Sequence, residues 1–124
     1  MTKILASRIT ANAEAGRFYE NRALNYFQSI GYTLVHSRLR NRDGECDLVM
    51  QKDNCLLFAE VKYRKLLMDV IISWRNRQKK NFLSIVRHYH GQFPTHQVEL
   101  KFIGFWKDGV KVFDLEWRDL QSCH

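Results

Sequence analysis

Three residues near the middle of the chain have types and spacing suited to holding a divalent cation. In the segment Phe58-Ala59-Glu60-Val61-Lys62, a carboxylate stands two positions before an ammonium. Strand side chains alternate between the two faces of a sheet, so Glu60 and Lys62 would share one face. Asp47 lies in the preceding apolar segment, although aspartate is uncommon in strands. This pattern indicates a polar cluster within a sheet.

A hairpin would bring the two carboxylates together. If Asp53-Asn54 is a two-residue loop, Asp47 faces Glu60 and Glu45 faces Lys62. Directly opposed residues have Cβ atoms roughly 4.5–5.5 Å apart, and like charges at that distance repel. A bridging cation removes the repulsion, and Mg²⁺ (or Mn²⁺) suits a pair of carboxylates. A three-residue loop would flip the faces, and a solvated ladder of opposite charges is the plainer alternative.

Glu20 is a further acidic candidate, on the helix expected before the strands. It follows Gly16 by one helical turn and precedes Ala23, Leu24 and Phe27 at helical spacing. It therefore borders the apolar face, where a helix meets its sheet. Its carboxylate could reach the same cation directly or through water. The alternative is an edge glutamate that points into solvent.

The apolar periodicity predicts the elements that would position these groups. Helical spacing covers residues 12–30, with Asn12 as N-cap and Gly31 as C-cap, and alternating or continuous apolar runs predict three strands next. The short gaps between those strands require antiparallel pairing. The prediction is an α/β fold, a mixed sheet with flanking helices, in a single domain over residues 1–124. The strands are expected at 32–40, 45–51, 56–63, 98–105 and 110–115, a second helix at 72–90, and a last helical turn at 116–120.

The acidic motifs resemble those of a known family. The segments that carry the resemblance are Gly16-Arg17-Phe18-Tyr19-Glu20, Gly44-Glu45-Cys46-Asp47-Leu48 and Phe58-Ala59-Glu60-Val61-Lys62-Tyr63-Arg64. They are similar to the motifs of the YraN-like family, which is grouped with the PD-(D/E)XK nuclease-like superfamily and with archaeal Holliday junction resolvases. The similarity extends from about Gly16 to Tyr89.

The resemblance implies a restriction-endonuclease-like αβββαβ core. It implies that Asp47 and Glu60 ligate the metal, that Lys62 assists the attacking water, and that Glu20 is the acidic residue of the first helix. The chain departs from the pattern at Cys46, where an aliphatic residue is usual, and at Tyr63, which replaces a small hydroxyl residue. Arg38 stands where an asparagine is often seen.

Basic residues flank these motifs along the chain. The formal net charge is +7, from 20 Lys and Arg against 13 Asp and Glu, which favours an anionic partner such as nucleic acid. DNA is favoured over RNA as that partner. Tyr63 or Trp74 could stack on a base, although packing is the commoner role. The residues expected to contact phosphates are Arg38, Arg40, Arg42, Arg64, Lys65, Arg75, Arg77, Lys79 and Lys80.

Composition narrows the class of protein. The three cysteines form no CxxC pair, which disfavours a zinc ribbon or a disulfide framework. No leader or membrane span is recognisable, so a cytoplasmic protein is expected. Resolvase-like relatives are often dimers, which leaves a homodimer open, although no apolar surface stripe predicts an interface. Three functions remain: a metal-dependent endonuclease, with selectivity for DNA structure left open; a nucleic-acid-binding module that keeps the nuclease fold without cleaving; and an interaction protein with a charged surface.

Overall fold

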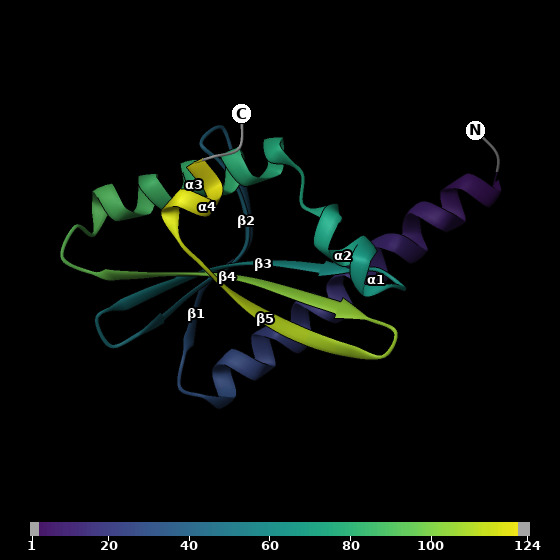
Figure 1. Cartoon of the computed structure of the whole chain (residues 1–124), viewed down its shortest axis with the longest axis horizontal. Coiled ribbons are helices and arrows are strands. Elements are labelled where there is room, and N and C mark those ends of the chain that lie inside the picture. The colour runs from purple at the N-terminus through teal and green to yellow at the C-terminus, as the bar shows by residue number, and fades with distance from the viewer. Residues whose placement is uncertain (1–2, 122–124) are drawn as a thin grey trace.

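The computed structural model describes the backbone of residues 3–121 and the side chains of residues 14–118 and 120. Within residues 3–121, four helices and five strands follow one another (Figure 1). Their bounds are α1 Lys3–Ser29, β1 Thr33–Asn41, β2 Gly44–Lys52, β3 Cys55–Tyr63, α2 Leu67–Ser73, α3 Asn76–Gln92, β4 Gln97–Trp106, β5 Gly109–Leu115 and α4 Trp117–Gln121.

The five strands form one mixed sheet in the order β1-β2-β3-β4-β5. All neighbours pair antiparallel except β3 and β4, which are parallel. Parallel neighbours need a crossover connection, and α2 and α3 supply it. The sequence-based prediction of an α/β fold with an αβββαβ core and flanking helices is confirmed.

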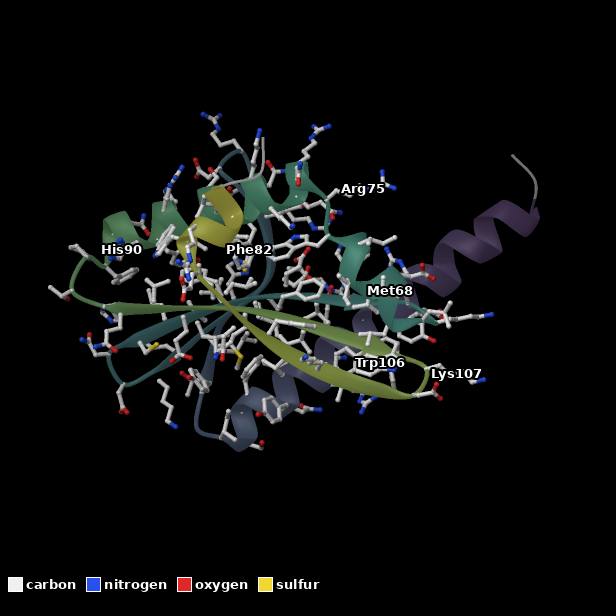
Figure 2. All side chains as sticks on the ribbon, viewed as in Figure 1. Met68, Arg75, Phe82, His90, Trp106 and Lys107 are labelled. Atoms are coloured by element: carbon white, nitrogen blue, oxygen red, sulfur yellow. The ribbon has the colours of Figure 1, made fainter. Side chains whose placement is uncertain are left out.

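Helices cover both faces of the sheet (Figure 1). On one face, α1 packs Phe27 against Met50 and Leu57. On the other, α3 packs Phe82 and Ile85 against the sheet. Figure 2 shows Phe82 lying between α3 and the strands. Burial of two faces explains why β2 and β3 carry nearly continuous apolar runs.

The first helix is longer than the periodicity predicts. It begins at Lys3 rather than at Asn12, so Asn12 is not an N-cap. No proline or glycine interrupts residues 3–12, and alanines favour continued helix. The predicted C-cap is confirmed, because Gly31 has a φ of +102°. Among residues 3–121, no helix combines the length and apolar character needed to cross a bilayer.

The prediction of one continuous helix over residues 72–90 is wrong. Trp74 and Arg75 are extended, with ψ values of 98° and 160°, and they separate α2 from α3. Trp74 is only 6% exposed, so the chain leaves helical geometry where this indole enters the core. The Arg75 N–H donates to Gln78 Oε1 at 3.2 Å and helps to begin α3. The predicted last helical turn is present as α4.

The second helix, α2, has an apolar outer side that the sequence pattern did not single out. Val70 is fully buried, yet most of the large apolar side chains around it face solvent. Met68, labelled in Figure 2, is 67% exposed. The exposed residues are Leu66, Leu67, Met68, Ile71 and Ile72.

Candidate metal-binding cleft

The β2–β3 hairpin has the predicted two-residue loop. Backbone pairing runs from Lys52–Cys55 to Leu48–Ala59, and Asp53 in the loop has a φ of +50°. Beyond Leu48, the Asp47 side chain is the hydrogen-bond acceptor in place of the backbone: its Oδ2 accepts a hydrogen bond from the Val61 N–H at 2.8 Å. A carboxylate thus replaces a backbone carbonyl of the ladder, and Asp47 is fixed at the end of the paired region.

Glu60 lies close to Asp47, as predicted. Its side chain is buried, and burial raises its pKa well above the ordinary range. The neighbouring Asp47 carboxylate raises that pKa further, whereas the Lys62 ammonium, 3.5 Å from Glu60 Oε2, lowers it. Glu60 is therefore in contact with both the Asp47 carboxylate and the Lys62 ammonium. The repulsion between the two carboxylates is only partly offset by the single cation.

The predicted opposition of Glu45 and Lys62 is wrong. Glu45 lies opposite Arg40 of β1, with 3.9 Å between its Oε2 and Arg40 Nη1. The pairing of β2 with β3 stops at Leu48–Ala59, before it reaches Glu45. Lys62 is consequently left to pair with Glu60 of its own strand.

Glu20 of α1 reaches the same region and is held by Arg38 of β1. The distance from Arg38 Nε to Glu20 Oε2 is 2.6 Å. The register places Arg38 between the Ser37–Leu48 and Leu39–Cys46 pairs, opposite Asp47. Burial and the Asp47 charge raise the pKa of Glu20, against the lowering effect of Arg38. Asp47 is thus the middle member of a row of three carboxylates.

A cleft of about 660 Å³ opens at this row. Glu20, Asp47 and Lys62 line it, so α1, β2 and β3 each contribute one of the predicted residues. Glu60 is 6% exposed and lies behind them, in contact with Asp47 and Lys62. The remaining lining residues are Ala15, Gly16, Arg40, Val61, Tyr63, Arg64 and Lys65.

The basic residues expected to contact phosphates divide into groups. Arg40, Arg64 and Lys65 line the cleft, and Arg38 pairs with Glu20. The others lie at the surface of different elements: Arg42 is exposed in the β1–β2 turn, and Arg75, Arg77 and Lys80 are exposed around the start of α3. Lys79 lines a separate cavity, where its Nζ lies 5.8 Å from the Trp74 ring centroid.

Two aromatic residues considered for base stacking are engaged with protein. Tyr63 lines the cleft, but its ring stacks on Tyr19 with centroids 4.2 Å apart and planes 7° apart. Trp74 is buried and stacks on Phe102 at 5.1 Å. One face of each ring is therefore occupied by packing, which leaves at most the other face for a ligand.

The donor set fits a hydrated Mg²⁺ or Mn²⁺ ion. Each carboxylate is held by a neighbour: Glu20 by Arg38, Asp47 by the Val61 N–H, and Glu60 by Lys62 and Asp47. Within the described residues, no three His, Cys, Asp or Glu side chains are placed so that together they could hold a metal ion. Mg²⁺ keeps several waters and uses one or two carboxylates, so an open set of oxygen donors suits it better than a cage would.

The ion pair between Arg38 and Glu20 was missed by reasoning from the sequence. Alternation along a strand predicts that Arg38 shares a face with Arg40, and the sequence therefore predicts that both contact phosphates. The Arg38 φ of +52° departs from strand geometry and redirects the side chain toward α1. The sequence does carry one signal, since an arginine stands where the family pattern has asparagine.

Comparison with known proteins identifies the relatives of the chain. The model of the uncharacterised protein family UPF0102 matches residues 19–115. A UPF0102 protein of Ruegeria pomeroyi is 34% identical over 77% of this chain and 78% of its own. Another from Bradyrhizobium diazoefficiens is 30% identical over 81% and 76%. A third, from Sulfurihydrogenibium, is 41% identical, and that match spans 41% of this chain and 44% of the relative.

Proposed function

The chain belongs to UPF0102, and from the geometry of its cleft we propose that it is a Mg²⁺- or Mn²⁺-dependent endonuclease of the PD-(D/E)XK nuclease-like superfamily that hydrolyses phosphodiester bonds in DNA. One observation carries the proposal: Glu20, Asp47 and Lys62 line a single cleft with Glu60 directly behind them. Such a set is hard to explain by stability, because apolar side chains of similar volume in a buried site are often at least as stable as a buried group of ionisable ones.

In the proposed hydrolysis, the acidic residues of the cleft and Lys62 have different roles. Asp47 and Glu60, aided by Glu20, would hold the cation, whose chemistry would be to lower the pKa of water and offset charge on the phosphate. Lys62 already contacts Glu60; its ammonium would orient the attacking water and stabilise negative charge as the P–O bond breaks. Asp47, fixed by the Val61 N–H, would keep the donor set in place.

The rim of the cleft favours a polyanionic substrate. Arg40, Arg64 and Lys65 line it together with Lys62. These cations come from β1, from the end of β3 and from the segment after it, so they surround the carboxylates rather than forming one stripe. Contacts of this kind supply affinity without reading sequence. Replacing any one of them with glutamine should reduce the slope of log affinity against log salt by about 0.9 on duplex DNA.

A cleavage assay tests the proposal. End-labelled branched, nicked, duplex and single-stranded DNA, with matched RNA, would be incubated with Mg²⁺, Mn²⁺ or EDTA. We expect cation-dependent cleavage of DNA that is lost in Asp47→Asn, Glu60→Gln and Lys62→Met. Asp53→Asn is the matched control, because Asp53 lies in the loop at the far end of the same hairpin and asparagine tolerates its positive φ.

A non-catalytic nucleic-acid-binding module is the second candidate. The observation that favours it is that Arg38 and Lys62 already pair with Glu20 and Glu60, so the site is partly neutralised without a metal. DNA binding that is unchanged in Asp47→Asn and Glu60→Gln, without cleavage by the parent under any cation, would establish the module and refute the nuclease. Absence of salt-dependent binding would refute both.

A further inference from the structure

Arg38 holds Glu20 in an ion pair at the edge of the candidate metal site. The two side chains meet with 2.6 Å between Arg38 Nε and Glu20 Oε2, and the Glu20 side chain is only 17% exposed. A hydrogen bond between two charged groups is stronger than one between neutral groups. A cation in the cleft would therefore have to compete with a guanidinium for this carboxylate.

The backbone at Arg38 departs from strand geometry and directs the side chain to Glu20. Arg38 is one of two non-glycine residues with a positive φ in the part of the chain that the structure describes. Such a conformation is uncommon for arginine and persists only where surrounding contacts fix it. The β1–β2 register continues on both sides, with the Ser37–Leu48 and Leu39–Cys46 pairs. Strained backbone of this kind concentrates at functional sites, which favours a role for Arg38 beyond packing.

Glu20 is close enough to the other carboxylates to interact with them. The Asp47 charge raises the pKa of Glu20, and both residues line the cleft. Even so, among the residues whose side chains are described, no three acidic, histidine or cysteine groups are placed to hold one metal ion. The arrangement thus offers two carboxylates, Asp47 and Glu60, and keeps the third paired with a cation of the protein itself.

We propose that Arg38 is a positioning residue that keeps Glu20 from ligating the cation directly, so that Asp47 and Glu60 alone hold the ion. This inference rests on the proposed metal site. A hydrolytic metal site needs open positions for water and substrate, and a third direct carboxylate would occupy one of them. Arg38 thereby lowers the affinity of the cleft for the cation and preserves room for water and phosphate.

Mn²⁺ binding to the full chain without DNA, measured from the electron paramagnetic resonance signal of free Mn²⁺, tests the proposal. Arg38→Met removes the charge and the donors and adds no oxygen ligand. Methionine is unbranched at Cβ, as arginine is, so the backbone meets the same strain. Replacing a group that contacts a metal ligand changes metal affinity by about 10–100-fold. We expect Arg38→Met to bind Mn²⁺ about tenfold more tightly than the parent.

Two further variants separate release of Glu20 from loss of charge. Arg40 also lowers the pKa of Glu20 through its charge, whereas Arg38 acts through a hydrogen bond as well. Arg40→Met is therefore the matched control, and at about 0.15 M salt, where exposed charges are screened, it should leave Mn²⁺ affinity nearly unchanged. Adding Glu20→Gln to Arg38→Met should abolish the gain, because the released carboxylate supplies it.

Each contrary result overturns a stated part of the reasoning. Unchanged or weaker Mn²⁺ binding by Arg38→Met, an equal gain in Arg40→Met, or a gain that survives Glu20→Gln would overturn the proposal. Binding that persists in Asp47→Asn would do the same, because it would place the ion outside the cleft. No Mn²⁺ binding by either the parent or Arg38→Met would refute the metal site itself. Since no cleavage is measured, a chain that binds Mn²⁺ as expected but leaves DNA intact would refute only the nuclease.

Discussion

Because Asp47 accepts a hydrogen bond from Val61, we expect Asp47→Ala and Asp47→Asn to change the stability of the fold differently. Asp47→Ala leaves the Val61 N–H without its acceptor at a position where Asp47 is only 9% exposed. A hydrogen bond to a charged acceptor contributes about 1.5–3 kcal/mol. Relief of the repulsion with Glu60 offsets part of this loss, so we expect Asp47→Ala to lower the free energy of unfolding by about 1–2 kcal/mol.

Asp47→Asn keeps an oxygen that can accept from Val61 and removes the negative charge. We expect its stability to equal or exceed that of the parent. Urea unfolding at pH 8 without divalent cations measures both variants. With a slope of about 1–3 kcal/mol per molar urea, the two midpoints should differ by roughly 1 M.

The control pair is Asp108→Ala and Asp108→Asn, in the exposed β4–β5 turn. Those two variants should differ by less than about 0.5 kcal/mol. Equal midpoints for the Ala and Asn variants of Asp47, or greater stability of the alanine variant, would refute the assignment of a structural hydrogen bond to this carboxylate.

Three further outcomes follow from groups elsewhere in the structure. The raised pKa of Glu60 means that the fold favours its neutral form, so its contribution to the free energy of unfolding is full below its ordinary pKa of 4.5 and is lost as pH rises through the folded pKa. Urea unfolding across pH 4–8 without metal should therefore show a smaller loss of stability with rising pH in Glu60→Gln than in the parent. The same dependence of unfolding free energy on pH in both proteins would contradict this. Burial and Glu99 raise the pKa of Cys55 to about 12, so at pH 9 its alkylation by iodoacetamide, followed by peptide mass spectrometry, should be at least about a hundredfold slower in the folded chain than in urea. Gly44→Ala should lower the thermal midpoint by roughly 10 °C, because Gly44 has a φ of +144° and a Cβ there would lie 2.0 Å from the Asn81 carbonyl oxygen; an unchanged midpoint would show that α3 moves freely.

Local sequence signals were enough to predict the hairpin and the residues that meet on it. The Asp53-Asn54 loop fixes the register, and the register with side-chain alternation brings Glu60 to Asp47 and Lys62. Helical spacing placed Glu20 at the border of α1 and the sheet, where it lines the cleft.

Features set by tertiary packing were not predictable from the sequence. The break between α2 and α3 depends on Trp74 entering the core, and its apolar character also suits a continuous helix. The positive φ of Arg38 removes it from the strand face that alternation assigns to it. The end of β2–β3 pairing at Leu48 depends on a side chain replacing a backbone acceptor, which no periodicity reports.

The sequential order of the strands has a consequence for how the site assembles. The β1–β2–β3 meander joins neighbours through short turns, whereas β3 meets β4 only after the chain has passed through α2 and α3. Small loops close with the least loss of chain entropy, which favours early contact between Asp47 and Glu60, while water still surrounds both. The cost of holding Glu60 beside Asp47 rises only when the rest of the fold buries Glu60, which is 6% exposed in the folded chain. The electrostatic cost of the site is therefore incurred when the fold closes over the hairpin rather than when the hairpin forms.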